Sequence, residues 1–390
     1  MNFTDDIRYI GVNDHISDLF EGQYIIPNGM AYNSYVILDE KTAVTDTTEA
    51  KFTDAWLQNL AGALEENMPD YLIVHHMEPD HSAAIREFMG AYPEAVIIAS
   101  FPAFSMMRNF CGTDYPDRRI VVRDGDKLNL GMHTLTFFTA PMVHWPEVIM
   151  SYDSADGVLF SADAFGKFGA LDIPDDDWAC EARRYYFGIV GKYGDCVQPL
   201  LKKLSGLDIR TICPLHGPAL TENLNYYINL YDTWSSYCPE STGTVIAYTS
   251  VYGGTKAAAE LLAEKLREKD CGDVVVDDLS RMDMAEAVED AFRYGNLVLA
   301  TTTYNAGIFP VMDTFIRQLT ERGYKNRKVG LIENGSWAPC AAKLMREMFC
   351  DCNNICFAGP VVSITSVLNE KSRAQIDALA EELTRKEKCC

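Results

Sequence analysis

Short apolar runs alternate with longer amphipathic stretches along the second half of the chain, and this alternation predicts strands followed by helices. The apolar runs predict strands at Thr244–Tyr248, Val274–Val276, Leu297–Thr301, Lys328–Ile332 and Ile355–Phe357. The amphipathic stretches predict helices at Lys256–Glu268, Ala285–Tyr294, Val311–Glu321, Pro339–Phe349 and Ser372–Lys386. Because a helix follows every strand, we expect a small, doubly wound parallel sheet.

The first half has more strand-like runs and fewer long helical stretches. A polar patch that contains glycine and proline, Cys238–Gly243, separates the two halves, and the length of 390 residues also favours more than one domain. We therefore expect a mixed α/β domain over residues 1–240 and a second α/β domain over residues 243–390. The strands predicted in the first half are Ser34–Leu38, Tyr71–Val74, Ala95–Ala99, Thr134–Thr139, Val158–Ser161 and Ile209–Cys213.

Composition and charge argue against a membrane, secreted or nucleic-acid-binding protein. Hydrophobic residues make up 48% of the chain, yet no apolar run reaches the ~18 residues of a membrane span. The N-terminal residues lack the basic and apolar regions of a signal peptide, so we expect a cytoplasmic protein. The net charge of −22 argues against a nucleic-acid partner, which would require a basic face.

The 12 cysteines are scattered except near the C-terminus, and in the cytoplasm we expect reduced thiols. Cys350, Cys352 and Cys356 form a C-x-C-x3-C cluster without a C-x2-C pair, so a metal or iron–sulfur role for it stays open. Cys389 and Cys390 close the sequence, and we expect a flexible tail there.

Side chains that can bind metals follow four of the strands predicted in the first half. Directly after Tyr71–Val74 comes the motif H-x-E-x-D-H, with four such side chains within six residues. A single metal-capable side chain after a strand is usually a helix cap or a loop residue. Four strand ends that each carry at least one metal-capable side chain indicate a metal site. The complete set is His76, Glu78, Asp80, His81, His144, Asp163 and His216.

This set of ligands is too large for one tetrahedral ion and suits two ions that share a bridging carboxylate. Imidazoles and carboxylates without a thiolate favour a first-row metal such as iron, zinc or manganese. His75 precedes the motif and points the opposite way if the segment is extended. We therefore expect His75 to support the ligands rather than to bind metal.

Three loops of the second half predict a flavin site. The loop after Thr244–Tyr248 is rich in hydroxyls and glycines and leads into a helix, which suits a phosphate. The loops after Leu297–Thr301 and Lys328–Ile332 offer aromatic and small residues that suit an isoalloxazine ring. The candidate residues are Ser250, Val251, Tyr252, Gly253, Gly254, Thr255, Thr303, Tyr304, Asn305, Ala306, Gly307, Asn334, Gly335, Ser336, Trp337 and Ala338.

The first of these loops resembles the phosphate loop of flavodoxins, usually written T-x-T-G-N-T. Gly254 stands in place of the usual Asn, which keeps a backbone donor and loses a side-chain contact. Neither a P-loop ending nor a GxGxxG fingerprint is present in the sequence. The loop therefore favours FMN, a mononucleotide, over FAD or NAD.

The metal motif resembles that of the metallo-β-lactamase fold, H-x-H-x-D-H, with a later His, an Asp and a last His. Glu78 stands where that fold has its second His. With Glu78, the set has four imidazoles and three carboxylates, so two ferrous ions and one hydroxide would neutralise it. The more anionic ligand set favours iron over zinc.

By this resemblance we assign His76, Glu78 and His144 to one iron, and Asp80, His81 and His216 to the other. Asp163 bridges the two irons. Whether His81 binds iron is left open, because in relatives of this type water sometimes displaces the ligand at that position.

A lactamase-like domain followed by a flavodoxin-like domain resembles the flavodiiron proteins, in the minimal two-domain class. The motifs that carry the resemblance are H-x-E-x-D-H, A-P-x-x-H-W-P, the Ser161–Gly166 run, P-x-H-G-P and the Thr303–Pro310 loop. The resemblance implies a cytoplasmic enzyme that reduces O2 to water, NO to N2O, or both. It also implies a head-to-tail homodimer or a dimer of dimers, with rubredoxin or a reduced deazaflavin as electron donor.

Two other interpretations stay open. One is a dizinc hydrolase of the lactamase fold with a flavodoxin-like domain appended, against which Glu78 argues. The other is an electron carrier with a vestigial metal site, against which the complete ligand set argues. The sequence does not decide between O2 and NO, between dimer and tetramer, or between the possible donors.

Overall fold

The computed structural model describes residue 4 and residues 6–174, 177–270 and 272–385. Its contacts divide the chain into two compact units, Met1–Asp232 and Thr233–Cys390, each of which is described by itself. No helix within the described ranges is long and apolar enough to cross a membrane.

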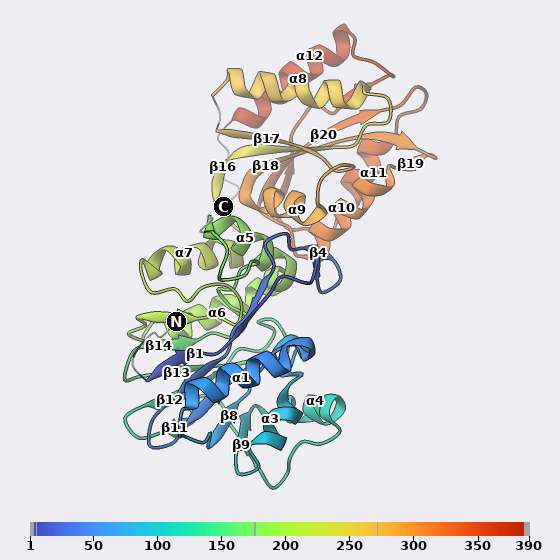
Figure 1. The fold of residues 1–390 in the computed structure, drawn as a ribbon. Helices are drawn as coiled ribbons and strands as arrows, with labels where there is room; N and C mark the ends of the chain where they lie inside the picture. The colour runs from blue at the N-terminus through green and yellow to red at the C-terminus, as the bar shows by residue number, and fades with distance from the viewer. Residues whose placement is uncertain (1–3, 5, 175–176, 271, 386–390) are drawn as a thin grey trace. The chain divides into compact units, whose positions relative to one another are not determined.

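Two sheets pack against each other in the first unit (Figure 1), because buried residues of both, such as Ile73 and Phe137, belong to one hydrophobic core. The first sheet has the order β1 (Ile7–Tyr9), β6 (Tyr35–Ile37), β7 (Ala43–Thr45), β8 (Tyr71–Ile73), β9 (Val96–Ala99), β10 (Arg119–Val121). The second has the order β11 (Lys127–Asn129), β12 (Thr134–Thr139), β13 (Ile149–Asp153), β14 (Val158–Phe160), β15 (Thr211–Cys213). Two small pairs join β2 (Val12–Asp14) to β5 (Met30–Tyr32) and β3 (Leu19–Phe20) to β4 (Tyr24–Ile25).

Helices cover the outer faces of these two sheets. Their ends follow local rules: the Ser100 hydroxyl caps α4 by accepting from the Ala103 N–H, and Gly112 ends the same helix in the left-handed region. On the side of the first sheet are α1 (Thr53–Leu64), α3 (Ile85–Ala91) and α4 (Phe101–Cys111), and the short helix α2 (Pro79–Ser82) precedes α3 in the chain. On the side of the second are α5 (Trp178–Tyr185), α6 (Gly194–Leu204) and α7 (Leu224–Ser235). Short helical turns of other types span Ala50–Phe52, Tyr186–Val190 and Gly191–Tyr193.

The second unit is a doubly wound sheet with the order β17 (Asp273–Asp278), β16 (Ser241–Tyr248), β18 (Tyr294–Tyr304), β20 (Arg327–Asn334), β21 (Ile355–Phe357). These five strands are parallel, while β19 (Gly307–Ile308) and β22 (Val362–Ile364) pair with β18 and β20. Two helices, α8 (Gly254–Glu268) and α12 (Glu370–Thr384), pack on one face and share its core. On the other face lie α9 (Met284–Arg293), α10 (Pro310–Glu321) and α11 (Ala341–Glu347) (Figure 1).

The predicted fold class, a lactamase-like sandwich followed by a doubly wound parallel sheet, is confirmed, and two local predictions were wrong. Tyr294, predicted as the last residue of a helix, is the first residue of β18. The sequence analysis predicted no helix at Asp80 and His81, but both lie in the short helix α2, which Pro79 begins at its first position. The predicted helix end at Lys386 and the tail cysteines Cys389 and Cys390 lie outside the described residues.

Candidate metal centre

The metal-capable residues singled out in the sequence converge within the first unit. His76 and Glu78 follow β8 of the first sheet, and α2 then carries Asp80 and His81. His144, Asp163 and His216 follow β12, β14 and β15 of the second sheet. All of these side chains are largely buried, and their ligand atoms form two groups, each within 4.8 Å.

The first group consists of His76, Glu78, His144 and Asp163. The Nε2 atom of His144 lies 3.0 Å from Oε2 of Glu78 and 3.0 Å from Oδ2 of Asp163. The Nε2 atom of His76 lies 3.2 Å from the same Glu78 oxygen and 3.3 Å from the same Asp163 oxygen. Donor atoms at this spacing can surround one metal ion, because metal–nitrogen and metal–oxygen bonds are about 2.0–2.2 Å long.

The second group consists of Asp80, His81 and His216. Oδ2 of Asp80 lies 3.2 Å from Nε2 of His81 and 3.3 Å from Nε2 of His216. The other oxygen of Asp163, Oδ1, lies 3.4 Å from the His81 nitrogen and 3.7 Å from the His216 nitrogen. One carboxylate therefore presents each of its oxygens to a different group, as a ligand that bridges two metals does.

The unsatisfied hydrogen-bonding atoms of this cluster indicate a site for cations. Both oxygens of Asp80 and both of Asp163 are buried without a hydrogen-bond donor among the described residues. The Nε2 atoms of His81 and His216 lie 3.0 Å apart, although at most one of two neutral rings can carry the proton between them. Buried carboxylates without donors are costly, and bound cations satisfy them.

The electrostatics of the cluster point the same way. Burial by itself would lower the pKa of His144, but the carboxylates of Asp163 and Glu78 outweigh it and raise that pKa to about 9. Burial would raise the pKa values of Asp163 and Glu78, but the neighbouring imidazoles lower both. The carboxylates thus stay ionised and the site attracts positive charge.

Two carboxylates that the sequence analysis missed hold the histidines in place. Oε1 of Glu147 accepts hydrogen bonds from Nδ1 of His76 at 2.8 Å and from the Met77 N–H at 2.9 Å. Oδ2 of Asp46 lies 2.6 Å from Nδ1 of His75, whose Nε2 lies 2.8 Å from the Ser151 hydroxyl. The structure thus places His75 outside both groups. Glu147 follows His144 in the same loop, and this proximity was the only signal in the sequence.

Two further side chains lie beside the cluster. The hydroxyl of Tyr185 is buried without a hydrogen-bond partner in the described part of the chain. Burial, followed by the charge of Asp163 and its neighbours, raises the pKa of Tyr185, so this hydroxyl stays protonated. Glu21 is an exposed residue of the β3–β4 turn, and partial burial of its carboxyl, followed by the charge of Glu78, raises the pKa of Glu21 to about 7.

The backbone of the loop that carries Asp163 is unusual. Ala162 has φ = 50° and Phe165 has φ = 67°, in the left-handed region that side chains other than glycine rarely adopt. Phe165 is held there by Tyr231, because its N–H donates to the Tyr231 hydroxyl and the two rings stack 4.2 Å apart. Strain of this kind concentrates at functional sites, where the surrounding packing fixes it.

Cysteines take no part in the metal-capable groups found in the described ranges. Cys350 and Cys356 are exposed and Cys352 is half-buried, and none of them forms a disulfide. A third group, His133, Asp153 and Asp156, was not singled out in the sequence. His133 is ion-paired there, with Nδ1 3.2 Å from the Asp153 carboxylate.

The three predicted flavin loops gather at one edge of the second unit. The Gly253 N–H donates to the Ser250 hydroxyl at 3.1 Å, and α8 begins at Gly254 with its free N–H groups at this loop. The loops are tied together by the Thr255 hydroxyl, 3.2 Å from that of Thr302, and by the Asn334 amide, 3.4 Å from Thr255 Oγ1.

Close packing explains why a glycine stands at position 254. A Cβ atom at this position would lie 2.2 Å from the carbonyl oxygen of Ser366, so only glycine fits. Ser366 belongs to a fourth loop that the sequence analysis missed, and it makes three hydrogen bonds to the predicted loops, one of them from its N–H to Oδ1 of Asn334 at 3.0 Å. Its carbonyl accepts from the Asn334 amide at 3.2 Å, and its hydroxyl lies 2.8 Å from that of Ser336.

The second flavin loop is tighter than predicted. Thr303 and Tyr304 are the last residues of β18, and Asn305 and Ala306 form a two-residue turn with positive φ before β19. In the third loop Asn334 is the last residue of β20, and Gly335–Ala338 leads toward α11. The aromatic rings of these loops are exposed, namely Tyr252, Tyr304 and Trp337.

Comparison with known proteins places both units. The family model described as ODP family beta lactamase matches residues 30–217, and the flavodoxin model matches residues 246–349. An anaerobic nitric oxide reductase flavorubredoxin from Salmonella arizonae is 28% identical over 386 residues, covering 96% of this chain and 78% of the relative. The putative diflavin flavoprotein A 1 from Nostoc sp. is 28% identical over 342 residues, covering 86% of this chain and 58% of the relative.

Solved structures agree with this placement. The rubredoxin oxygen:oxidoreductase of Desulfovibrio gigas superposes with a TM-score of 0.91 at 25% identity, covering 98% of this chain and 97% of that one. A flavo di-iron protein variant from Thermotoga maritima, at 24% identity, shares the fold with a TM-score of 0.88 and 98% coverage of both chains. Three observations agree on one family: the order of the two domains, the relatives that span nearly the whole chain, and the two-group metal centre. The chain belongs to the flavodiiron proteins.

Proposed function

We propose that this protein reduces O2 to water, NO to N2O, or both, at two irons. His76, Glu78 and His144 hold one iron, Asp80, His81 and His216 hold the other, and Asp163 bridges them. The observation that carries the proposal is the carboxylate of Asp163, whose Oδ2 lies 3.0 Å from the His144 nitrogen and whose Oδ1 lies 3.4 Å from the His81 nitrogen.

FMN and two non-haem irons are the cofactors of this flavodiiron protein. When bound, the irons supply the positions at which a diatomic is reduced, and FMN supplies the electrons. We propose that residues 1–240 form the diiron domain and residues 243–390 the FMN domain. The three predicted loops hold the flavin, with its phosphate at the start of α8 and its ring beside Tyr304 and Trp337.

Each protein group at the metal centre has a definite task. Glu147 accepts the proton on Nδ1 of His76, which leaves Nε2 free as a ligand. His216 is fixed in the same way, because its Nδ1 lies 2.8 Å from the Ala31 carbonyl oxygen. The buried hydroxyl of Tyr185 is able to donate a hydrogen bond within the cluster. Both reactions consume protons, which these buried residues must admit while bulk water is kept out.

Two exposed apolar patches support a head-to-tail homodimer. One lies on the second unit at the flavin loops and consists of Tyr252 and Trp337, which are 98% and 83% exposed. The other lies on the first unit around the β3–β4 pair and consists of Ile16, Leu19 and Ile25. Exposed apolar patches mark interaction sites. Contact between the flavin patch of one copy and the second patch of its partner brings the flavin toward the irons.

We propose rubredoxin as the electron donor and the cytoplasm as the location. Relatives named flavorubredoxin and rubredoxin oxygen:oxidoreductase support this donor, and a reduced deazaflavin is the second candidate. No feature of the described site favours the hydrolase alternative, which requires zinc together with thioesterase or lactonase activity.

The test uses the full-length holoprotein, with iron and FMN counted on the same sample. The protein is reduced anaerobically, and O2 and NO are then added in separate electrode experiments. We expect rapid consumption of at least one gas by protein that holds two irons per FMN, and far slower consumption by protein stripped of iron that keeps its FMN. Equal consumption by the stripped protein, or tightly bound zinc with hydrolase activity, would refute the proposal.

A further inference from the structure

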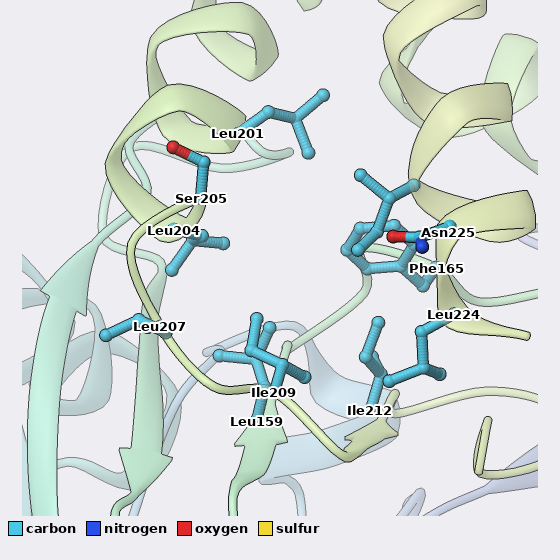
Figure 2. A pocket seen from close by; sticks show the side chains of 11 residues that line it. Leu159, Phe165, Leu201, Leu204, Ser205, Leu207, Ile209, Ile212, Leu224 and Asn225 are labelled. Atoms are coloured by element: carbon cyan, nitrogen blue, oxygen red, sulfur yellow. The ribbon is translucent and has the colours of Figure 1, made fainter. Parts of the chain in front are cut away.

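An apolar pocket of about 260 Å³ lies in the first unit, between α6, α7 and the second sheet. Figure 2 shows its side chains around an open space, with Leu201 and Leu204 on one side and Phe165 and Leu224 on the other. Its only polar side chains are those of Ser205 and Asn225, both exposed at the rim, and no charged group lines it. The pocket therefore suits neither the flavin phosphate nor a metal ion.

The floor of this pocket belongs to the strands that carry the metal centre. Leu159 of β14 and Ile212 of β15 are neighbours in the parallel register, and both are buried. Four residues further along the chain from each of them, in the loops that follow these two strands, lie Asp163 and His216. Four extended residues span at most about 14 Å, so the floor and the ligand cluster belong to one small region.

Phe165 connects the pocket to the ligand loop. Its ring lines the pocket, and its backbone lies two residues beyond Asp163 in the loop with positive φ. The next residue, Gly166, packs closely against Tyr185 and His216. A Cβ atom at this position would lie 3.3 Å from the Tyr185 ring and 3.4 Å from Cβ of His216. The inner wall of the pocket is thus Phe165, with Gly166 and the ligand His216 behind it.

We propose that this pocket takes up the uncharged diatomic substrate from water and passes it along Phe165 to the metal centre. The inference rests on the proposed function, which makes O2 or NO the substrate. Small uncharged molecules move from water into apolar surroundings because burial of apolar surface is favourable. An apolar cavity of about 150 Å³ already holds benzene or xenon, so this pocket is large enough for a diatomic.

Xenon is the probe, because it is uncharged, apolar and independent of turnover. The holoprotein is pressurised with xenon, and the site is located in a crystal or by the shift of the ¹²⁹Xe resonance. Leu201→Trp, at the half-buried rim, fills the pocket. The matched control is Lys202→Trp, which adds the same ring at the next, exposed position of α6 outside the pocket.

We expect xenon in the pocket of the wild-type and Lys202→Trp proteins and none in Leu201→Trp. The Leu201→Trp variant should also lose about tenfold in kcat/KM for the gas, with kcat at saturation, iron, FMN and Tm retained. Unchanged kcat/KM in a variant that no longer binds xenon overturns the proposal, as does a wild-type protein without xenon in the pocket. If the wild-type protein reduces neither gas, the proposed function itself is refuted. Xenon bound in the pocket would then show only that the cavity is apolar.

Discussion

The carboxylate of Glu147 offers a sharp test of how the protein prepares its metal ligands. It is 1% exposed, and a single oxygen accepts hydrogen bonds from Nδ1 of His76 and the Met77 N–H. The substitution Glu147→Gln keeps the shape and one acceptor oxygen but removes the negative charge. The imidazole of His76 then becomes a weaker metal ligand, because the charge behind it no longer strengthens its Nε2 lone pair.

The expected loss of iron affinity depends on which of the two hydrogen bonds to residue 147 each variant can still accept. Loss of a residue that orients a metal ligand usually lowers metal affinity by about 10–100-fold. Because glutamine retains an acceptor, we expect the lower end, about tenfold or ~1.4 kcal/mol. Glu147→Ala removes the acceptor and leaves the Nδ1 proton of His76 unpaired, so its loss should approach the upper end of that range.

The assay is competition for iron between the protein and a chelator, with FMN content as an internal reference. The matched control is Asp153→Asn, which removes the charge from a buried carboxylate paired with His133, outside the metal centre. We expect this control to bind iron like the wild type. Unchanged iron affinity in Glu147→Gln, or an equal loss in Asp153→Asn, would show that Glu147 has no role in preparing His76.

Three further predictions concern separate parts of the chain. Glu78→Ala should lose iron and keep FMN in metal and flavin assays, because the two sites lie in different units; loss of both would indicate misfolding instead. Gly254→Asn should weaken FMN binding in a fluorescence titration without changing iron content, since its Cβ would meet the Ser366 carbonyl at 2.2 Å; unaltered FMN affinity would contradict this. Burial, followed by nearby acidic residues, raises the pKa of Asp277 to about 8 from 3.8, so the folded state holds a proton that the unfolded state releases, and stability falls as pH rises from about 4 to 8. Asp277→Asn should therefore raise Tm more at pH 8 than at pH 4 in calorimetry, and an equal change at both pH values would count against it.

Much of the second unit could be predicted from the sequence, because its buried parallel strands are nearly continuous apolar runs. Ile355–Phe357 was predicted with its observed bounds, and β16, β18 and β20 were found but extend further than the apolar runs. The first unit was harder. Its missed strands, such as β1 and β10, are three residues long, too short to show a period of two.

The site shows the same division. The order of strands and ligands along the chain was enough to select the seven metal-capable residues, since each follows an apolar run. Glu147, Asp46 and Ser366 gave no such signal, because an acidic or hydroxyl residue in a loop is ordinarily solvated. Their roles come from partners that are distant in sequence, such as Asp46 with His75, 29 residues away.

The sequence by itself predicted the metal-capable side chains, their position after strand ends and a division into two domains, because these depend on local periodicity and residue chemistry. Only the tertiary structure decided that the two oxygens of Asp163 face different groups, that Glu147 stands behind His76 and that an apolar pocket reaches Phe165. These features depend on how two sheets and their helices pack in space, and that packing leaves no periodic pattern along the chain.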